Sequence, residues 1–207
     1  MDKLYKGLHH FRESFFRKEE EFFQRISSGQ NPEVLFITCS DSRIDPNLVT
    51  QSRPGELFIV RNVGNIVPPH DAIRDKNSVA AALEYAVSAL KVKDIVICGH
   101  SNCGALQALF STDIGIPQYA HLRNWLSLAN PLHDIMKQYY GTRTKAVFAR
   151  IAEEENVLLQ LENIQTYPFI VEALQAGTLR LHGWYYDIGN GRVYAYNPET
   201  ESFDPLH

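Results

Sequence analysis

The chain has 207 residues, the length of about one domain at the usual ~100–200 residues per domain. Its 20 basic and 24 acidic residues give a net charge of −4, so it lacks the basic excess of a nucleic-acid-binding protein. A hydrophobic content of 44% excludes a disordered chain. Three cysteines are too few, and odd in number, for a disulfide-stapled secreted scaffold, which favours a reducing compartment.

The N-terminal segment predicts neither export nor membrane insertion. Residues 1–26 contain no uninterrupted apolar stretch like that of a signal peptide, and Glu13 and Glu19 argue against an organellar transit peptide. No eighteen apolar residues follow one another anywhere in the chain. We therefore expect a soluble, cytoplasmic protein that does not bind membranes.

One long amphipathic helix is predicted at the N-terminus. Its apolar residues recur at helical spacings: Leu4, Leu8, Phe11, Phe15, Phe22 and Ile26. We expect this helix, as an arm over residues 1–28, to pack against the rest of a single domain that spans 1–207. Its length and phenylalanine content favour the alternative that it reaches across to a second subunit.

Short apolar runs separated by helical segments follow the arm. Three runs rich in β-branched residues predict strands buried on both faces: residues 34–38, 57–61 and 95–98. Helices are predicted at 78–90 and 104–110. This alternation predicts a mostly parallel central sheet covered by helices on both sides, which places the chain in the α/β class.

The C-terminal part predicts a helix and a hairpin. Pro168 suits the first turn of a helix and Gly177 its C-terminal cap. Residues 178–186 and 192–196 flank a Gly-Asn-Gly turn, which indicates two antiparallel strands added to the sheet.

The most unusual side chains follow two of the predicted strands. Cys39 comes directly after residues 34–38, and His100 and Cys103 come shortly after residues 95–98. Ligands of open parallel sheets bind beyond the carboxyl ends of the strands, and two thiolates with one imidazole are typical zinc ligands. Three protein ligands leave a fourth position open, as in catalytic zinc sites. Each residue alone is more simply explained by burial in the core.

Asp41 and Arg43 follow Cys39 by two and four residues and can form a bidentate ion pair beside the metal. The carboxylate would then either bind zinc or accept a hydrogen bond from zinc-bound hydroxide. A surface ion pair of little consequence is an equally good explanation from spacing alone.

The combination of Cys-x-Asp-x-Arg with His-x-x-Cys resembles the β-class carbonic anhydrases, above all their bacterial, cyanobacterial and plant members. The similarity extends over nearly the whole chain, in six stretches: CSDSR at 39–43, PGELFIVRNVGN at 54–65, LEYAV at 83–87, CGHSNCGA at 98–105, ENVLLQLENIQTYPFI at 155–170 and LHGWYYDI at 181–188. The resemblance implies a carbonate dehydratase, which hydrates CO2 reversibly to bicarbonate and a proton by attack of zinc-bound hydroxide.

The resemblance also implies a site. One Zn²⁺ per subunit is expected on Cys39, His100 and Cys103, with Asp41 and Arg43 as the catalytic pair. The expected CO2-binding residues are Gln30, Phe58, Val63, Tyr85 and the backbone N–H of Gly104. Because the family builds its pocket partly from a neighbouring subunit, we expect a homodimer or a larger homo-oligomer, such as a tetramer or octamer.

Family members with an inhibitory bicarbonate pocket carry Trp and Gly where this chain has Phe36 and Thr38, so that pocket is not expected. We therefore expect Asp41 to pair with Arg43 and not with zinc. Hydrolysis of carbonyl sulfide or carbon disulfide on the same scaffold is the main alternative, and a zinc-binding protein without turnover is a weaker one. Nothing in the sequence indicates a carboxysome or an organelle stroma as its location.

Overall fold

The computed structural model describes residues 1–72, 76–111 and 119–206. Contacts within it divide the chain into two compact units, Met1–Asn31 and Pro32–His207. A single domain over 1–207 with an arm at 1–28 stays a prediction. Within the described ranges, no helix has an apolar stretch long enough to cross a membrane.

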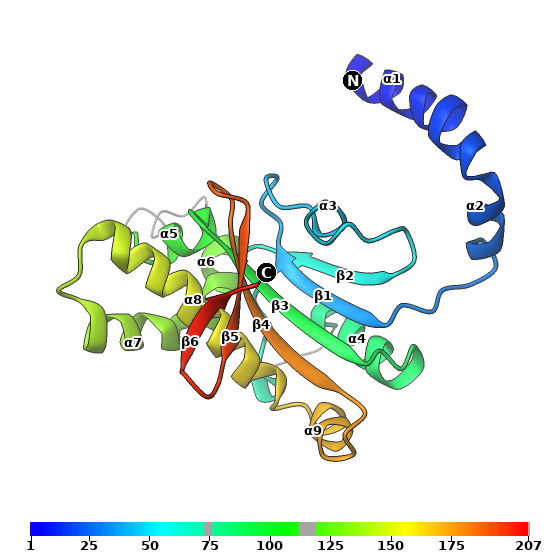
Figure 1. Ribbon diagram of the computed structural model, residues 1–207. Helices are drawn as coiled ribbons and strands as arrows, with labels where there is room; N and C mark the ends of the chain where they lie inside the picture. The colour runs from blue at the N-terminus through cyan, green and yellow to red at the C-terminus, as the bar shows by residue number, and fades with distance from the viewer. Residues whose placement is uncertain (73–75, 112–118, 207) are drawn as a thin grey trace. The chain divides into compact units, whose positions relative to one another are not determined.

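The first unit is helical, but its helix is interrupted. It consists of α1 (Asp2–His10), a π-helical segment η1 (Phe11–Phe16) and α2 (Glu20–Ile26). Phe11 and Phe23 are twelve residues apart, or about 18 Å along a straight helix, yet their ring centroids lie 5.8 Å apart. The chain therefore bends between them, as the arc in Figure 1 shows. The helical segments contain no buried side chain.

The described part of the second unit is built on a six-stranded sheet of order β2-β1-β3-β4-β5-β6. Its strands are β1 (Val34–Cys39), β2 (Leu57–Asn62), β3 (Asp94–His100), β4 (Arg180–Asp187), β5 (Arg192–Asn197) and β6 (Ser202–Pro205). β2, β1, β3 and β4 pair in parallel, and β5 and β6 continue the sheet from β4 with antiparallel pairing. The predicted α/β class, parallel strands and hairpin are therefore confirmed. The sequence patterns did not indicate β6.

Helices surround the sheet. The helical elements are α3 (Pro46–Thr50), η2 (His70–Ala72), α4 (Ser78–Glu84), η3 (Tyr85–Ala89), α5 (Gly104–Leu109), α6 (Ala120–Leu126), η6 (Ser127–Ala129), α7 (Asn130–Tyr140), α8 (Lys145–Ile164) and α9 (Pro168–Gln175). The helices predicted around 78–90, from 104 and from Pro168 are confirmed, and Gly177 follows α9 with a φ of 66°. The long helix α8 was not predicted.

The two faces of the sheet are covered unequally. Leu35, Ile37, Ile95 and Ile97 point to one face and pack against side chains of α4, η3, α8 and α9. The opposite face carries a smaller cluster in which Phe36, Val96 and Cys98 pack with Ile44, from the segment that leads into α3. β2 is only half-buried, because it forms an edge of the sheet, whereas burial on both faces was predicted.

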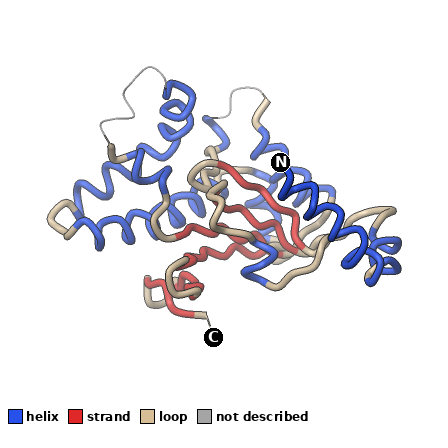
Figure 2. Tube along the Cα trace, turned by 90° about the horizontal axis from the view of Figure 1, so that it is seen from above, coloured by secondary structure: helices blue, strands red, loops and turns tan. Residues whose placement is uncertain are grey.

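The order of the strands creates a position suited to a ligand. The chain passes from β1 to β2 on one side and then crosses to β3 on the other side of β1. The loops after β1 and β3 therefore lead away in opposite directions and leave a crevice at the carboxyl ends of the two strands. Figure 1 shows β1 and β3 side by side, and Figure 2 shows the strands of the sheet in red, seen from above.

Candidate metal centre

Cys39, His100 and Cys103 meet at this switch point. Cys39 ends β1 and His100 ends β3, and the parallel register that pairs Thr38 with Cys98 brings the two ends level. Cys103 follows in the turn that opens α5. All three side chains are buried, and their ligand atoms lie within 4.8 Å of one another. The predicted convergence of the two loops is therefore present in the fold.

The donor atoms fit a tetrahedral metal. Two Zn–S bonds of about 2.3 Å at a tetrahedral angle place the sulfurs about 3.8 Å apart, and Cys39 Sγ and Cys103 Sγ are 3.9 Å apart. His100 Nδ1 lies 3.0 Å from the Ser101 carbonyl oxygen, which can only accept, so Nδ1 carries the proton. His100 Nε2 is buried without a hydrogen-bond partner and presents its lone pair to the two sulfurs. This orphaned atom is the feature that a metal ion would satisfy.

The two thiols are electrostatically coupled. A hydrogen bond with Cys103 lowers the pKa of the Cys39 thiol, against the opposing effect of burial, and the Gly64 N–H at 3.4 Å adds to the lowering. The same interaction and burial raise the pKa of Cys103. A pair in which one thiol readily ionises and the other resists is completed by a cation that binds both thiolates.

Asp41 forms a bidentate ion pair with Arg43. Arg43 Nε donates to Asp41 Oδ1 at 2.9 Å and Nη2 to Oδ2 at 2.7 Å, and the backbone N–H of Arg43 also donates to Oδ1, at 3.0 Å. These bonds hold the pKa of the Asp41 carboxyl well below its usual range. Asp41 Oδ2 remains 3.9 Å from His100 Nε2, so the carboxylate lies beside the ligand cluster but outside it.

Three further hydrogen bonds, which the sequence did not indicate, tie this pair to the loops. Arg43 Nη2 also donates to the carbonyl oxygen of Asn102, at 3.0 Å, and thus joins the loop after β1 to the loop after β3. Arg61 on β2 donates to the carbonyl oxygens of Cys39 and Asp41, at 3.1 and 2.7 Å. Arg61, at the end of the apolar run 57–61, carries no sequence signal of this role, because its partners are backbone atoms about twenty positions away in the sequence.

The predicted CO2-binding residues divide into two groups. Val63 follows β2 near the metal ligands and is 40% exposed, and Gly104 adjoins Cys103 with open space where a Cβ would be. Phe58, in contrast, is level with Leu35, four residues or about 13 Å along the strand from Cys39. Tyr85 lies beside Phe58, with the ring centroids 5.9 Å apart and the rings tilted by 52°, and is 48% exposed. One copy of the chain therefore does not bring Phe58 and Tyr85 to the metal ligands.

Gln30 is exposed and belongs to the first unit, at its boundary with the second. Its predicted contact with substrate stays a prediction.

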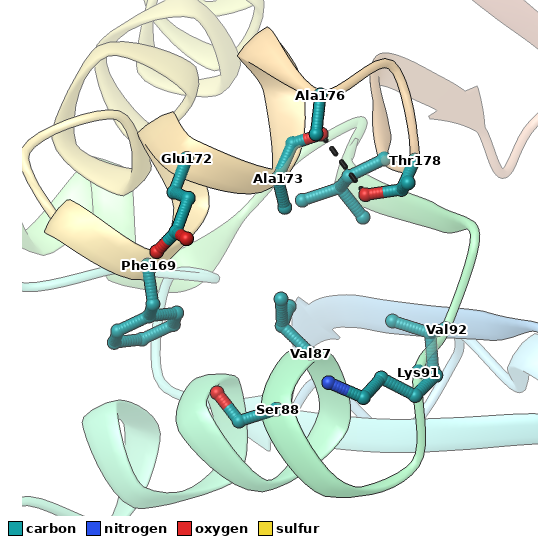
Figure 3. A pocket seen from close by; sticks show the side chains of 10 residues that line it. Val87, Ser88, Lys91, Val92, Phe169, Glu172, Ala173, Ala176 and Thr178 are labelled. Atoms are coloured by element: carbon teal, nitrogen blue, oxygen red, sulfur yellow. Dashed lines mark hydrogen bonds between the residues drawn. The ribbon is translucent and has the colours of Figure 1, made fainter.

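A separate cavity of about 260 Å³ lies between η3 and α9, at the amino ends of β3 and β4 (Figure 3). Lys91 and Glu172 are the charged residues that line it, and its ten lining residues include no histidine or cysteine. Thr178 Oγ1, on its wall, donates to the Ala173 carbonyl oxygen at 3.1 Å and is thereby satisfied. The cavity lies at the opposite end of the strands from Cys39 and His100, so it is no part of the metal centre.

Helix α8 places a buried carboxylate against Cys103, which the sequence patterns did not indicate. Glu153 is 4% exposed, and its carboxylate accepts from the backbone N–H of Cys103 at 3.0 Å and from Tyr185 Oη at 3.1 Å. Burial raises the pKa of this carboxyl, although both donors oppose the shift. A signal was available: Glu153, Asn156, Gln160 and Asn163 recur at helical spacing, and all four are buried.

Comparisons with known proteins agree with this site. The family model described as carbonic anhydrase matches residues 34–193. A carbonic anhydrase of Synechocystis sp. is 41% identical over 98% of this chain and 73% of its own length. Carbonic anhydrase 1 of Escherichia coli O157:H7 is 42% identical over 100% of this chain and 92% of its own.

Solved structures extend the likeness to three dimensions. The β-carbonic anhydrase CcaA superimposes with a TM-score of 0.96 at 41% identity, over 100% of this chain and 99% of the other. A tetrameric β-carbonic anhydrase of Sordaria macrospora gives a TM-score of 0.83 at 32% identity, over 94% and 97%. These likenesses in sequence and in structure show that the chain belongs to the β-carbonic anhydrase family of enzymes.

Proposed function

We propose that the chain catalyses the reversible hydration of CO2 to bicarbonate and a proton, with one zinc ion held by Cys39, His100 and Cys103. The observation that carries the proposal is the buried, unpartnered His100 Nε2 facing two thiols 3.9 Å apart. Zinc on three protein ligands supplies a Lewis acid that makes water a nucleophile near neutral pH.

Asp41 and Arg43 orient the reacting water in this proposal. Arg43 occupies both oxygens of Asp41 and so keeps the carboxylate from taking the open metal position. Each carboxylate oxygen has a second lone pair, so Asp41 Oδ2 can still accept a hydrogen bond from the water. The low pKa of Asp41 keeps this acceptor ionised at any physiological pH. A fixed acceptor directs the oxygen lone pair of the water to the substrate carbon.

CO2 is linear and apolar, so its pocket needs apolar walls and few polar donors. Val63 supplies such a wall, and the backbone N–H of Gly104 supplies a donor with no side chain to obstruct it. Phe58, Tyr85 and Gln30 are the remaining residues that we assign to substrate binding.

We propose that these remaining residues come from a second copy of the chain. Phe58 is half-buried and lies about 13 Å along the strand from Cys39 of its own chain. Tyr85, which is 48% exposed, lies beside Phe58, and this placement of the two aromatic residues favours a homodimer or larger assembly. The helices α1 and α2 bury no side chain of their own, and more than 60% of Leu4 and Leu8 is exposed, as in an arm that covers another subunit. Light scattering that gives a monomer at working concentration would contradict this assembly.

Metal content and turnover test the proposed reaction. The wild-type chain should bind one zinc per subunit and accelerate CO2 hydration in stopped-flow measurements with a pH indicator. Cys39→Ala should abolish both. Cys98→Ala is the matched control, because Cys98 is equally buried but its sulfur faces the small cluster with Phe36 and Val96.

Zinc binding without CO2 turnover would refute the enzymatic proposal, and sulfide release from carbonyl sulfide in place of CO2 hydration would favour the alternative substrate.

Residues Cys39, Cys98 and Cys103 are free thiols. This state fits a reducing compartment, for which we propose the cytoplasm.

A further inference from the structure

The buried face of α8 contacts the turn that carries Cys103 and the loop after β2, whose Gly64 in turn contacts Cys39. Asn156 Nδ2 donates to the Gly64 carbonyl oxygen at 3.1 Å, and the Gly64 N–H points to Cys39 Sγ at 3.4 Å. One turn earlier, Glu153 accepts from the Cys103 N–H at 3.0 Å. Adjacent turns of one helix thus contact the backbone N–H of Cys103 and the carbonyl group of Gly64, whose own N–H faces the Cys39 sulfur.

The side chains of Glu153 and Asn156 are held rigidly because their remaining polar atoms are also hydrogen-bonded. The second oxygen of Glu153 accepts from Tyr185 on β4, and Asn156 Oδ1 accepts from Gln160 Nε2 at 3.0 Å. Glu153 is 4% exposed and Asn156 is fully buried. A polar group in such surroundings has no water to replace a lost partner, so its geometry is strongly determined.

The helix itself is held at a fixed height above the sheet. A Cβ at Gly99 would lie 2.8 Å from Val157 Cγ2, and a Cβ at Gly183 would lie 2.9 Å from Leu161 Cδ1. β3 and β4 therefore contact α8 closely at both glycines, next to the turn that carries Glu153. In Figure 1, α8 accordingly runs along these two strands.

We propose that Glu153 and Asn156 are positioning residues that hold the thiols of Cys103 and Cys39 at the separation a metal ion requires. The inference rests on the proposed function, since it assigns these residues to the same zinc centre. Neither residue is a ligand. Glu153 acts through the backbone N–H of Cys103, and Asn156 acts through Gly64 in the loop after β2, whose N–H contacts the Cys39 sulfur.

The same face of α8 supplies a control. Asn163 is also buried, and it donates to the Val67 carbonyl oxygen at 2.9 Å and to Gln160 Oε1 at 3.1 Å, but it bonds neither Cys103 nor Gly64, the residue that contacts the Cys39 sulfur. Asn163→Leu removes the same kind of buried hydrogen bond as Asn156→Leu. Both variants should therefore lose thermal stability to a similar extent.

The experiment measures zinc release to excess chelator and the thiolate-to-metal absorption of the cobalt-substituted protein. Glu153→Leu and Asn156→Leu should release zinc roughly 10- to 100-fold faster than wild type and change the cobalt spectrum. Glu153→Gln retains an acceptor for the Cys103 N–H and should stay within about threefold of wild type. Asn163→Leu should keep the wild-type release rate and spectrum.

The inference is overturned if Asn163→Leu releases zinc as fast as Asn156→Leu, or if Glu153→Leu retains the wild-type rate and spectrum. If the leucine variants do not fold, Glu153→Asp asks the same question, because its carboxylate is one methylene too short to reach the Cys103 N–H without moving α8. A wild-type chain that bound neither metal would refute the proposed function itself, whereas normal metal binding in Glu153→Asp and Glu153→Leu would refute only the positioning role.

Discussion

Gly99→Ala is the substitution whose effect the structure defines most closely. Gly99 lies in β3 between Cys98 and His100, directly beneath α8. An added Cβ would meet Val157 Cγ2 at 2.8 Å and the backbone oxygen of Glu153 at 3.3 Å. Neither neighbour can rotate away, because Val157 is fully buried and β-branched and the other atom belongs to the backbone.

The magnitude follows from the displacement required. Carbon atoms attract best at about 3.5–4.0 Å, so β3 and α8 must separate by about 0.7 Å at this point. Overpacking of this kind costs ~1–3 kcal/mol. Alanine also restricts the unfolded chain, which returns ~0.4–1 kcal/mol. We expect the free energy of unfolding to fall by about 1–2 kcal/mol in total.

Urea denaturation at fixed protein concentration measures this change, provided that the m-value is unaltered. A double-mutant cycle with Val157→Ala tests its cause, since that substitution removes both γ-methyl groups from the clash. Gly99→Ala should cost less in the Val157→Ala background than in wild type, by about 1 kcal/mol. Additivity within ~0.4 kcal/mol would refute the close-contact explanation.

Three further outcomes are expected. Arg43→Ala should lower kcat/KM for CO2 hydration by about 10- to 100-fold without loss of zinc, because it frees Asp41 to approach the metal; unchanged kinetics would remove this pair from the mechanism. Arg180 and His182 lower the pKa of Asp94 to about 2 from its ordinary 3.8, so the stability from Asp94 is present above pH 4 and lost as the pH falls towards 2. Wild type should lose on the order of 1 kcal/mol more than Asp94→Asn over that range, after allowance for solvent screening, and parallel denaturation curves at pH 5 and 2.5 would contradict this. Metal removal by a chelator should lower Tm, because zinc binds only the native state, and an unchanged Tm would count against the centre.

Much of the fold was predictable from local patterns. The apolar runs that became β1 and β3 are β-branched and end at polar or reactive residues, so both the strands and the place of Cys39 and His100 at their carboxyl ends could be inferred. The runs did not show which strands lie at an edge, and β2 is half-buried for that reason.

The metal ligands could be assigned from the sequence because softness, charge and spacing belong to the residues themselves. The partners of those ligands could not, since a backbone group of Cys103 or Gly64 has the same local sequence signal whether it faces water or a side chain of α8. The helical spacing of Glu153 and Asn156 indicates that they share one face of a helix, but the spacing does not identify the residues that this face contacts.

The sequence by itself determined the class of the fold, the three candidate metal ligands and the family, because these depend on residue type and local order. Only the tertiary structure decided that Asp41 pairs with Arg43 beside the ligands, that α8 contacts the backbone of Cys103 and of Gly64, and that Phe58 lies far along the strand from Cys39. These relations depend on strand register and helix packing, which are set by contacts between residues up to a hundred positions apart.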